Sequence, residues 1–118
     1  MLKVIIAGGR DFNDYELLKS KCDYYLQNQD EITIISGHAR GADSLGEQYA
    51  NEKGYNVEIY PADWDKYGKS AGYKRNAEMA DVASAAICFW DGKSKGTKHM
   101  INLAKNKGIP VKIVRYGF

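Results

Sequence analysis

The sequence has few cysteines, no long apolar run and little net charge, and each absence excludes a class of protein. Its 118 residues include two cysteines, Cys22 and Cys88, which fall in a predicted helix and a predicted buried strand. Their number and spacing argue against a disulfide framework or a metal site, so we expect reduced thiols and no bound metal. No run approaches the roughly 18 apolar residues of a membrane span. Residues 1–6 enter a predicted strand without a cleavage site, so we expect a cytoplasmic protein with no membrane partner.

Charge is balanced overall but unevenly placed along the chain. The formal net charge is +2, yet residues 1–60 carry 6 basic and 10 acidic residues, whereas residues 61–118 carry 11 basic and 5 acidic ones. The basic excess gathers around Lys69, Lys74, Arg75, Lys93, Lys95 and Lys98. Such a cluster would attract an anionic ligand, although a solvated lysine face is the alternative. The length is that of one domain, which we expect to span residues 1–118.

Five apolar segments have the pattern of strands and alternate with helical patterns, which predicts an α/β fold with a mostly parallel sheet between two helical layers. The predicted strands are Leu2–Ala7, Ile32–Ile35, Asn56–Tyr60, Ala85–Trp90 and Pro110–Val114. The first, second and fourth are almost wholly apolar and belong inside the sheet, while the third and fifth alternate and belong at its edges. The Rossmann-like order 3-2-1-4-5 satisfies both conditions. The flavodoxin-like order 2-1-3-4-5 fits less well, because it would place the second strand at an edge.

Four helices are expected between these strands. A capping-box pattern of Asn13 and Glu16 predicts the start of the first helix. The others are expected over about Ala42–Lys53, Tyr73–Asp81 and Thr97–Lys107. Gly54 and Gly108 are predicted to end two of them. Residues 61–72 are polar, contain aromatic residues and are predicted to form a long loop.

Three glycine-rich turns are predicted to meet where the strand order reverses, between the first and fourth strands. Ligands bind there in open α/β sheets, outside the carboxyl ends of the strands. The turns are Gly8-Gly9-Arg10, Ser36–Asp43 and Asp91–Thr97. Glycines let a ligand approach the backbone, and the free N–H groups of a following helix suit a phosphate. The candidate ligand-binding residues are Gly8, Gly9, Arg10, Ser36, Gly37, Arg40, Gly41, Asp43, Arg75, Asn76, Asp91, Gly92, Ser94, Gly96 and Thr97.

These motifs keep the order found in a known superfamily. Together with Ala71–Asn76, the three turns make the chain resemble the SLOG superfamily, and more closely its single-domain branch related to YspA and YpsA. The turn Ser36–Asp43 is similar to a loop of the bacterial DNA-processing proteins. The segment Arg75–Ala80 with the turn after the fourth strand also resembles the Lonely Guy phosphoribohydrolases.

The resemblance implies a nucleotide or nucleotide-derived ligand, no other cofactor, and a homodimer or larger homo-oligomer. It implies that Gly92, Gly96 and Thr97 hold a phosphate and that Arg75 pairs with phosphate or ribose oxygens, which suits the fork of donors on a guanidinium. An ion pair of Arg75 with Glu78 or a neighbouring carboxylate is the alternative. The roles of two other residues also have two interpretations. Asn76 would bind the ligand or cap its helix, and Asp43 would bind a ribose hydroxyl or serve as a first-turn carboxylate.

One position departs from the phosphoribohydrolases, in which two residues separate the Gly-Thr pair from a catalytic glutamate. After Gly96-Thr97, residues 98 and 99 lead to Met100, and a thioether cannot replace that carboxylate. Glu78 and Asp91 are the candidates for a rearranged catalytic acid. His99 is either an acid–base group or a polar helix position.

Three functions remain open from the sequence. The first is binding of a nucleotide-like small molecule, as a sensor or a processing domain. The second is a single-stranded nucleic-acid-binding module like the DNA-processing proteins, which the small net charge and the acidic first half disfavour. The third is a nucleoside-monophosphate phosphoribohydrolase with a rearranged acid. Aromatic and basic residues alternate over residues 64–69, so this segment would stack on a base or act as a lid or packing loop.

Overall fold

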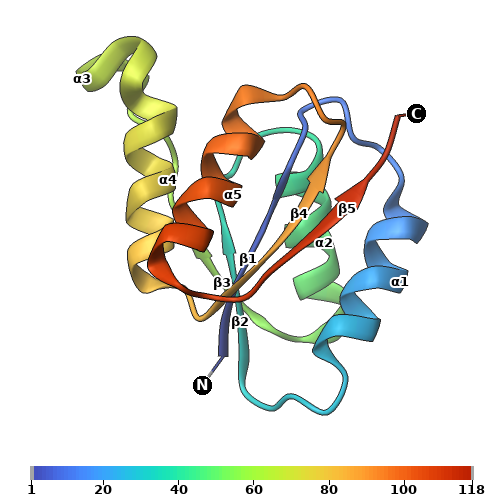
Figure 1. Ribbon diagram of the computed structural model, residues 1–118. Coiled ribbons are helices and arrows are strands. Elements are labelled where there is room, and N and C mark those ends of the chain that lie inside the picture. Colours follow the sequence, from blue (N-terminus) through green and yellow to red (C-terminus); the bar gives the residue numbers. More distant parts are fainter. Residues whose placement is uncertain (1, 118) are drawn as a thin grey trace.

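The computed structural model describes residues 2–117 and contains a five-stranded sheet with helices on both faces (Figure 1). The strands are β1 (Leu2–Gly8), β2 (Ile32–Ser36), β3 (Asn56–Ile59), β4 (Ala85–Trp90) and β5 (Val111–Arg115). Their order is β3-β2-β1-β4-β5, and all four pairings are parallel. The predicted Rossmann-like order is therefore confirmed.

Burial follows the apolar pattern of each strand. Ile5 of β1, Ile34 of β2 and Cys88 of β4 are fully buried, because these strands have neighbours on both sides and helices on both faces. The edge strand β3 has an exposed residue at each end. Glu58 of β3 forms an ion pair with Lys3 of β1, in which Oε2 of Glu58 lies 2.9 Å from Nζ of Lys3.

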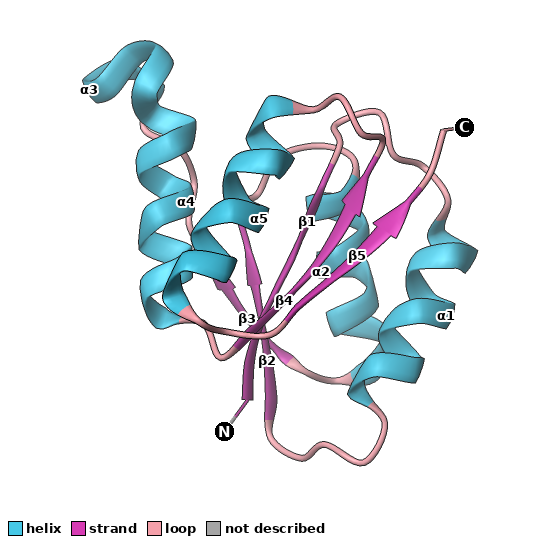
Figure 2. Cartoon of the chain, viewed as in Figure 1, coloured by secondary structure: helices cyan, strands magenta, loops and turns pink. Residues whose placement is uncertain are grey.

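The helices form two layers (Figure 2). The structure contains α1 (Tyr15–Leu26), α2 (Ala42–Lys53), α3 (Trp64–Tyr67), α4 (Ala71–Val82) and α5 (Lys95–Lys107), with a 3₁₀ turn at Gly68–Ser70. Residues of α1 and α2 share one hydrophobic core with the sheet, and residues of α4 and α5 share the other. No helix within residues 2–117 is long and apolar enough to cross a membrane.

The predicted loop over residues 61–72 is wrong, because most of it is helical. Asp63 accepts a hydrogen bond from the backbone N–H of Lys66 at 3.1 Å and so caps α3. Gly68, with φ +58°, ends α3, and the 3₁₀ turn leads directly into α4. Every residue of α3 is exposed, so this short helix has no apolar face from which the sequence could have predicted it.

Helix boundaries also differ slightly from prediction. Asp14, not Asn13, caps α1, because its Oδ1 accepts from the N–H of Leu17 at 3.0 Å. The α5 helix begins at Lys95, two residues earlier than predicted, because Ser94 is its N-cap. The predicted C-terminal glycines Gly54 and Gly108 both adopt the left-handed conformation and end α2 and α5.

Candidate anion-binding cleft

A cleft of about 670 Å³ lies where the carboxyl ends of β1 and β4 meet the turns that follow them. This is the switch point of the sheet, at the top of the view in Figure 1. Most of the predicted ligand-binding residues line it, namely Gly8, Gly9, Arg10, Arg40, Asp43, Arg75, Asn76, Asp91, Ser94, Gly96 and Thr97.

Four predicted residues lie behind this lining and shape it. Ser36 is fully buried. Gly41 has φ +80°, and a Cβ there would lie 2.3 Å from the carbonyl oxygen of Gly9. A Cβ at Gly37 would lie 2.6 Å from Nη1 of Arg75, and one at Gly92 would lie 2.4 Å from Nη2 of Arg115. These glycines therefore allow chain segments to approach closely, which is a structural role.

The turn between β4 and α5 is organised by Asp91. Its Oδ1 accepts hydrogen bonds from the backbone N–H groups of Ser94 and Lys93, each at 2.8 Å. These bonds favour the ionised carboxylate and lower the pKa of Asp91. Ser94 in turn accepts from the N–H of Thr97 at 3.4 Å. The turn thus orients the first turn of α5, whose leading N–H groups lack partners within the helix, at the edge of the cleft.

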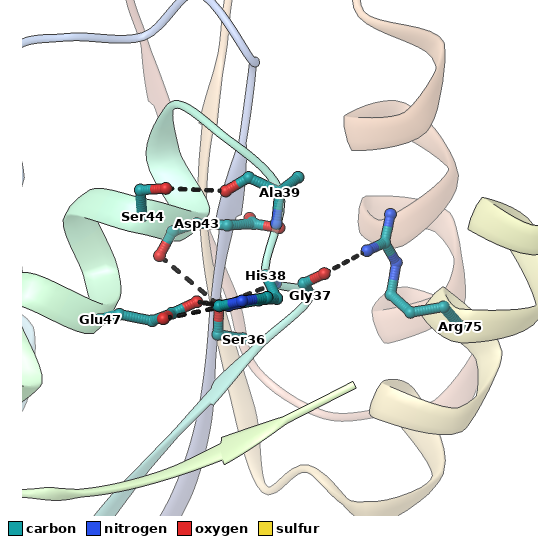
Figure 3. Close-up of polar contacts among 8 residues, drawn as sticks. All are labelled: Ser36, Gly37, His38, Ala39, Asp43, Ser44, Glu47 and Arg75. Atoms are coloured by element: carbon teal, nitrogen blue, oxygen red, sulfur yellow. Dashed lines mark hydrogen bonds and ion pairs between the residues drawn. The ribbon is translucent and has the colours of Figure 1, made fainter. Parts of the chain in front are cut away.

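Arg75 crosses the cleft from α4 to the loop after β2. Its Nη1 donates to the carbonyl oxygen of Gly37 at 2.5 Å (Figure 3). Its Nε donates to Oδ1 of Asn76 at 3.1 Å. The alternative ion pair with Glu78 is not the observed arrangement, because Glu78 is exposed and lies outside the cleft lining. Glu78 therefore does not join the other candidate residues.

Asn76 connects α4 to the start of α5. Its Nδ2 donates to the carbonyl oxygen of Gly96 and lies 3.2 Å from Nδ1 of His99. Asn76 lies within α4, so the predicted role as a cap of that helix is wrong. Burial lowers the pKa of His99, which fits a neutral ring that accepts a hydrogen bond from Asn76. His99 packs edge-on against Tyr73 and is outside the cleft lining.

Asp43 supplies a buried carboxyl group to the cleft. It is 7% exposed, and its Oδ2 accepts from the N–H of Ala39 at 3.2 Å. Burial raises the pKa of Asp43 to about 6, although the hydrogen bond from Ala39 and the charge of Arg75 oppose this rise. The carboxyl group therefore changes charge in the range where phosphates also titrate.

This titration predicts a pH-dependent affinity. Below about pH 6 Asp43 is neutral, so an anion in the cleft no longer faces its negative charge. We expect Asp43→Asn to bind AMP about fivefold more tightly than the wild type at about pH 7.5, and about equally at about pH 5. Calorimetry on both proteins tests this, and the titration of the AMP phosphate cancels because it is common to both. Parallel pH profiles would contradict the assignment.

The ionisation of Asp43 also makes the stability of the folded state depend on pH. The folded pKa of about 6 exceeds the ordinary value of 3.8, so the folded state retains the proton more strongly than the unfolded chain. The contribution of Asp43 to stability is therefore present below about pH 4 and is lost as the pH rises through about 6.

Glu47 of α2 contacts the loop that follows β2, although the sequence analysis did not identify this residue. Its Oε2 accepts from Oγ of Ser36 at 2.7 Å and lies 2.9 Å from Nδ1 of His38 (Figure 3). His38 itself has φ +60°, a conformation that this contact helps to hold. The spacing of four residues between Asp43 and Glu47 on a predicted helix would have placed both on one face beside the loop.

Fold and cleft together define a Rossmann-like α/β protein with a polar cleft, lined by three arginines, at its switch point. The chain belongs to the YspA, cpYpsA-related SLOG family, whose family model matches residues 2–67. The predicted resemblance is thereby confirmed.

Two similar proteins extend this comparison. The gene 61 protein of Mycobacterium phage D29 is 35% identical, and the match covers 94% of each chain. The structure of DNA processing protein A from Streptococcus pneumoniae superposes with a TM-score of 0.77 at 20% identity. That match covers all of this chain and 52% of the other, so the present chain spans about half of that protein. At this identity the likeness shows a shared fold.

Proposed function

We propose that the cleft binds the phosphate of a nucleotide or a nucleotide-derived small molecule, so that the protein acts as a sensor or a processing domain. The observation that supports this most directly is that Arg10, Arg40, Arg75 and the first turn of α5 line the same cleft. Guanidinium groups offer forks of donors to phosphate oxygens. A helix N-terminus adds free N–H groups and the positive end of its dipole.

The volume of the cleft and the hydrogen-bonding groups that line it support the same ligand class. The cleft volume of about 670 Å³ lies within the range of roughly 300–1,000 Å³ that is typical of small-molecule sites. Three carboxyl groups also line the cleft, and each already accepts hydrogen bonds: Asp91 from two backbone N–H groups, Asp43 from Ala39 and Asp11 from Tyr116. The groups that remain to bind an anion are therefore the arginine donors and the first N–H groups of α5. The homo-oligomer that the resemblance implies is part of this proposal.

Gly96 offers a direct test, because its environment is open. Apart from its chain neighbours and its own helix backbone, no atom of the described residues would lie within 4 Å of a Cβ at this position. We expect Gly96→Val to fold with an unchanged melting temperature but to bind AMP at least about tenfold more weakly, because the new side chain would occupy the phosphate position. Asn102→Val, on an exposed face of α5, is the matched control. Normal binding of AMP by Gly96→Val would place the phosphate elsewhere.

Single-stranded nucleic acid is the second candidate, because the fold is shared with a protein named for DNA processing and residues 61–118 are basic. A salt titration separates the two candidates. A protein that contacts several phosphates loses affinity steeply as salt rises, whereas a site for one small anion responds weakly. Tighter binding of an oligothymidylate than of AMP, with a steep salt dependence, would favour the nucleic-acid function and contradict the proposal.

A further inference from the structure

A second cavity of about 210 Å³ adjoins the cleft on the side of α3 and α4. It shares Arg10, Arg75, Asn76 and Gly96 with the lining of the larger cleft, so the two spaces are contiguous. Its volume is below the range of roughly 300–1,000 Å³ expected for a complete small-molecule site. This cavity therefore fits one part of a ligand whose remainder occupies the larger cleft.

The walls that belong to the second cavity alone are aromatic and basic. They are supplied by Trp64, Lys69, Gly72 and Tyr73. Trp64 is 50% exposed and Tyr73 is 46% exposed, although both rings are large and apolar. Rings left accessible at the wall of a concave site can bury their faces against a planar ligand group.

Neighbouring residues hold the indole of Trp64 in position. The guanidinium carbon of Arg10 lies 5.8 Å from the centroid of the indole ring. A Cβ at Gly72 would lie 3.5 Å from Cη2 of Trp64 and 3.7 Å from Nη2 of Arg75. The indole edge of Trp64 and the guanidinium of Arg75 therefore both lie beside Gly72, which brings the aromatic wall close to the arginine that is predicted to bind the phosphate.

We propose that this cavity is a ring-binding subsite, in which the base of a nucleoside phosphate stacks against Trp64 beside Tyr73 while its phosphate lies near Arg75 and Gly96. The inference rests on the proposed function and deepens it, because it requires a ligand that has both an anionic group and a planar ring. The α3 segment, Trp64–Tyr67, then forms the outer wall of the nucleotide site.

The geometry favours a single base over a polynucleotide. Tyr67, the other exposed ring of α3, is already approached by Lys66 and Lys74, whose Nζ atoms lie 5.1 Å and 4.8 Å from its centroid. The subsite is small, and a strand of nucleic acid would use a series of stacking platforms along a groove.

The test compares two ligands that differ by the ring. AMP and ribose 5-phosphate both carry the phosphate, so binding of each is measured by calorimetry on the wild type, Trp64→Ala and Trp64→Phe. We expect Trp64→Ala to weaken AMP binding at least about tenfold, while ribose 5-phosphate binding changes by less than about twofold and Trp64→Phe retains most of the AMP affinity. Tyr24→Ala, which removes a 65% exposed ring on α1, is the matched control.

Each outcome separates this inference from the function on which it rests. If the wild type binds neither ligand, the proposed function fails. If it binds both and Trp64→Ala leaves AMP affinity unchanged, the phosphate site stands and the ring subsite is overturned. An equal loss of both ligands in Trp64→Ala, with an unchanged melting temperature, would also overturn it, because Trp64 would then shape the phosphate site and not bind the ring. Preferential binding of an oligothymidylate that depends on Trp64 would replace the single nucleotide with a nucleic acid.

Discussion

Arg75→Ala is expected to weaken AMP binding at least about tenfold, which corresponds to about 1.4 kcal/mol. The guanidinium lines both cavities, so a phosphate in the cleft would meet its donors directly. The substitution also removes the donor to the carbonyl of Gly37, a buried residue. We therefore expect an accompanying loss of stability of roughly 1–3 kcal/mol, because a buried carbonyl without a partner is costly.

Two comparisons separate charge from geometry in this experiment. Arg75→Lys keeps the positive charge but loses the planar fork, so its affinity for AMP should lie between those of the wild type and Arg75→Ala. Lys105→Ala removes one positive charge from the exposed last turn of α5, far from the cleft, and should leave affinity unchanged. Unchanged calorimetry for a folded Arg75→Ala protein would remove Arg75 from the site.

The second large effect concerns catalysis, since the wild type is expected to release little or no base from nucleoside monophosphates. Met100 occupies the position of the catalytic glutamate in the phosphoribohydrolases that the sequence resembles, lines the cleft and is 1% exposed. A thioether cannot stabilise the positive charge that develops on the ribose. Loss of one such electrostatic interaction typically costs a factor of about 100 to 1,000 in rate.

The assay measures base release from a panel of nucleoside monophosphates by the wild type, Met100→Glu and Met100→Gln. We expect Met100→Glu to exceed the wild type by about 100-fold, whereas Met100→Gln, which has a similar size but no charge, remains at the wild-type rate. Because burial raises the pKa of a carboxyl group, the assay is run at mildly alkaline pH. Rapid wild-type turnover would contradict the prediction and direct attention to Asp11, Asp43 and Asp91, whose carboxyl groups line the cleft.

The strand order could be predicted because burial imposes different patterns on interior and edge strands. The runs at Leu2–Gly8, Ile32–Ser36 and Ala85–Trp90 are apolar on both faces, so they had to lie in the middle of the sheet. The α3 helix could not be predicted in this way. Its four residues are all exposed, and the side chain of Asp63 and the conformation of Gly68 define its ends. A helix without a buried face leaves no periodicity in a sequence.

The sequence by itself determined the strand order and most of the cleft, because glycine-rich turns after buried parallel strands converge at one edge of the sheet. The tertiary structure alone decided which of these residues line the cleft and which support the turns. It joined Arg75 to Gly37 and Asn76 to Gly96, and it placed Glu78 outside the cleft. Such contacts link residues 38 and 20 positions apart in the sequence. They depend on the packing of α4 against the sheet and α5, which local sequence patterns do not encode.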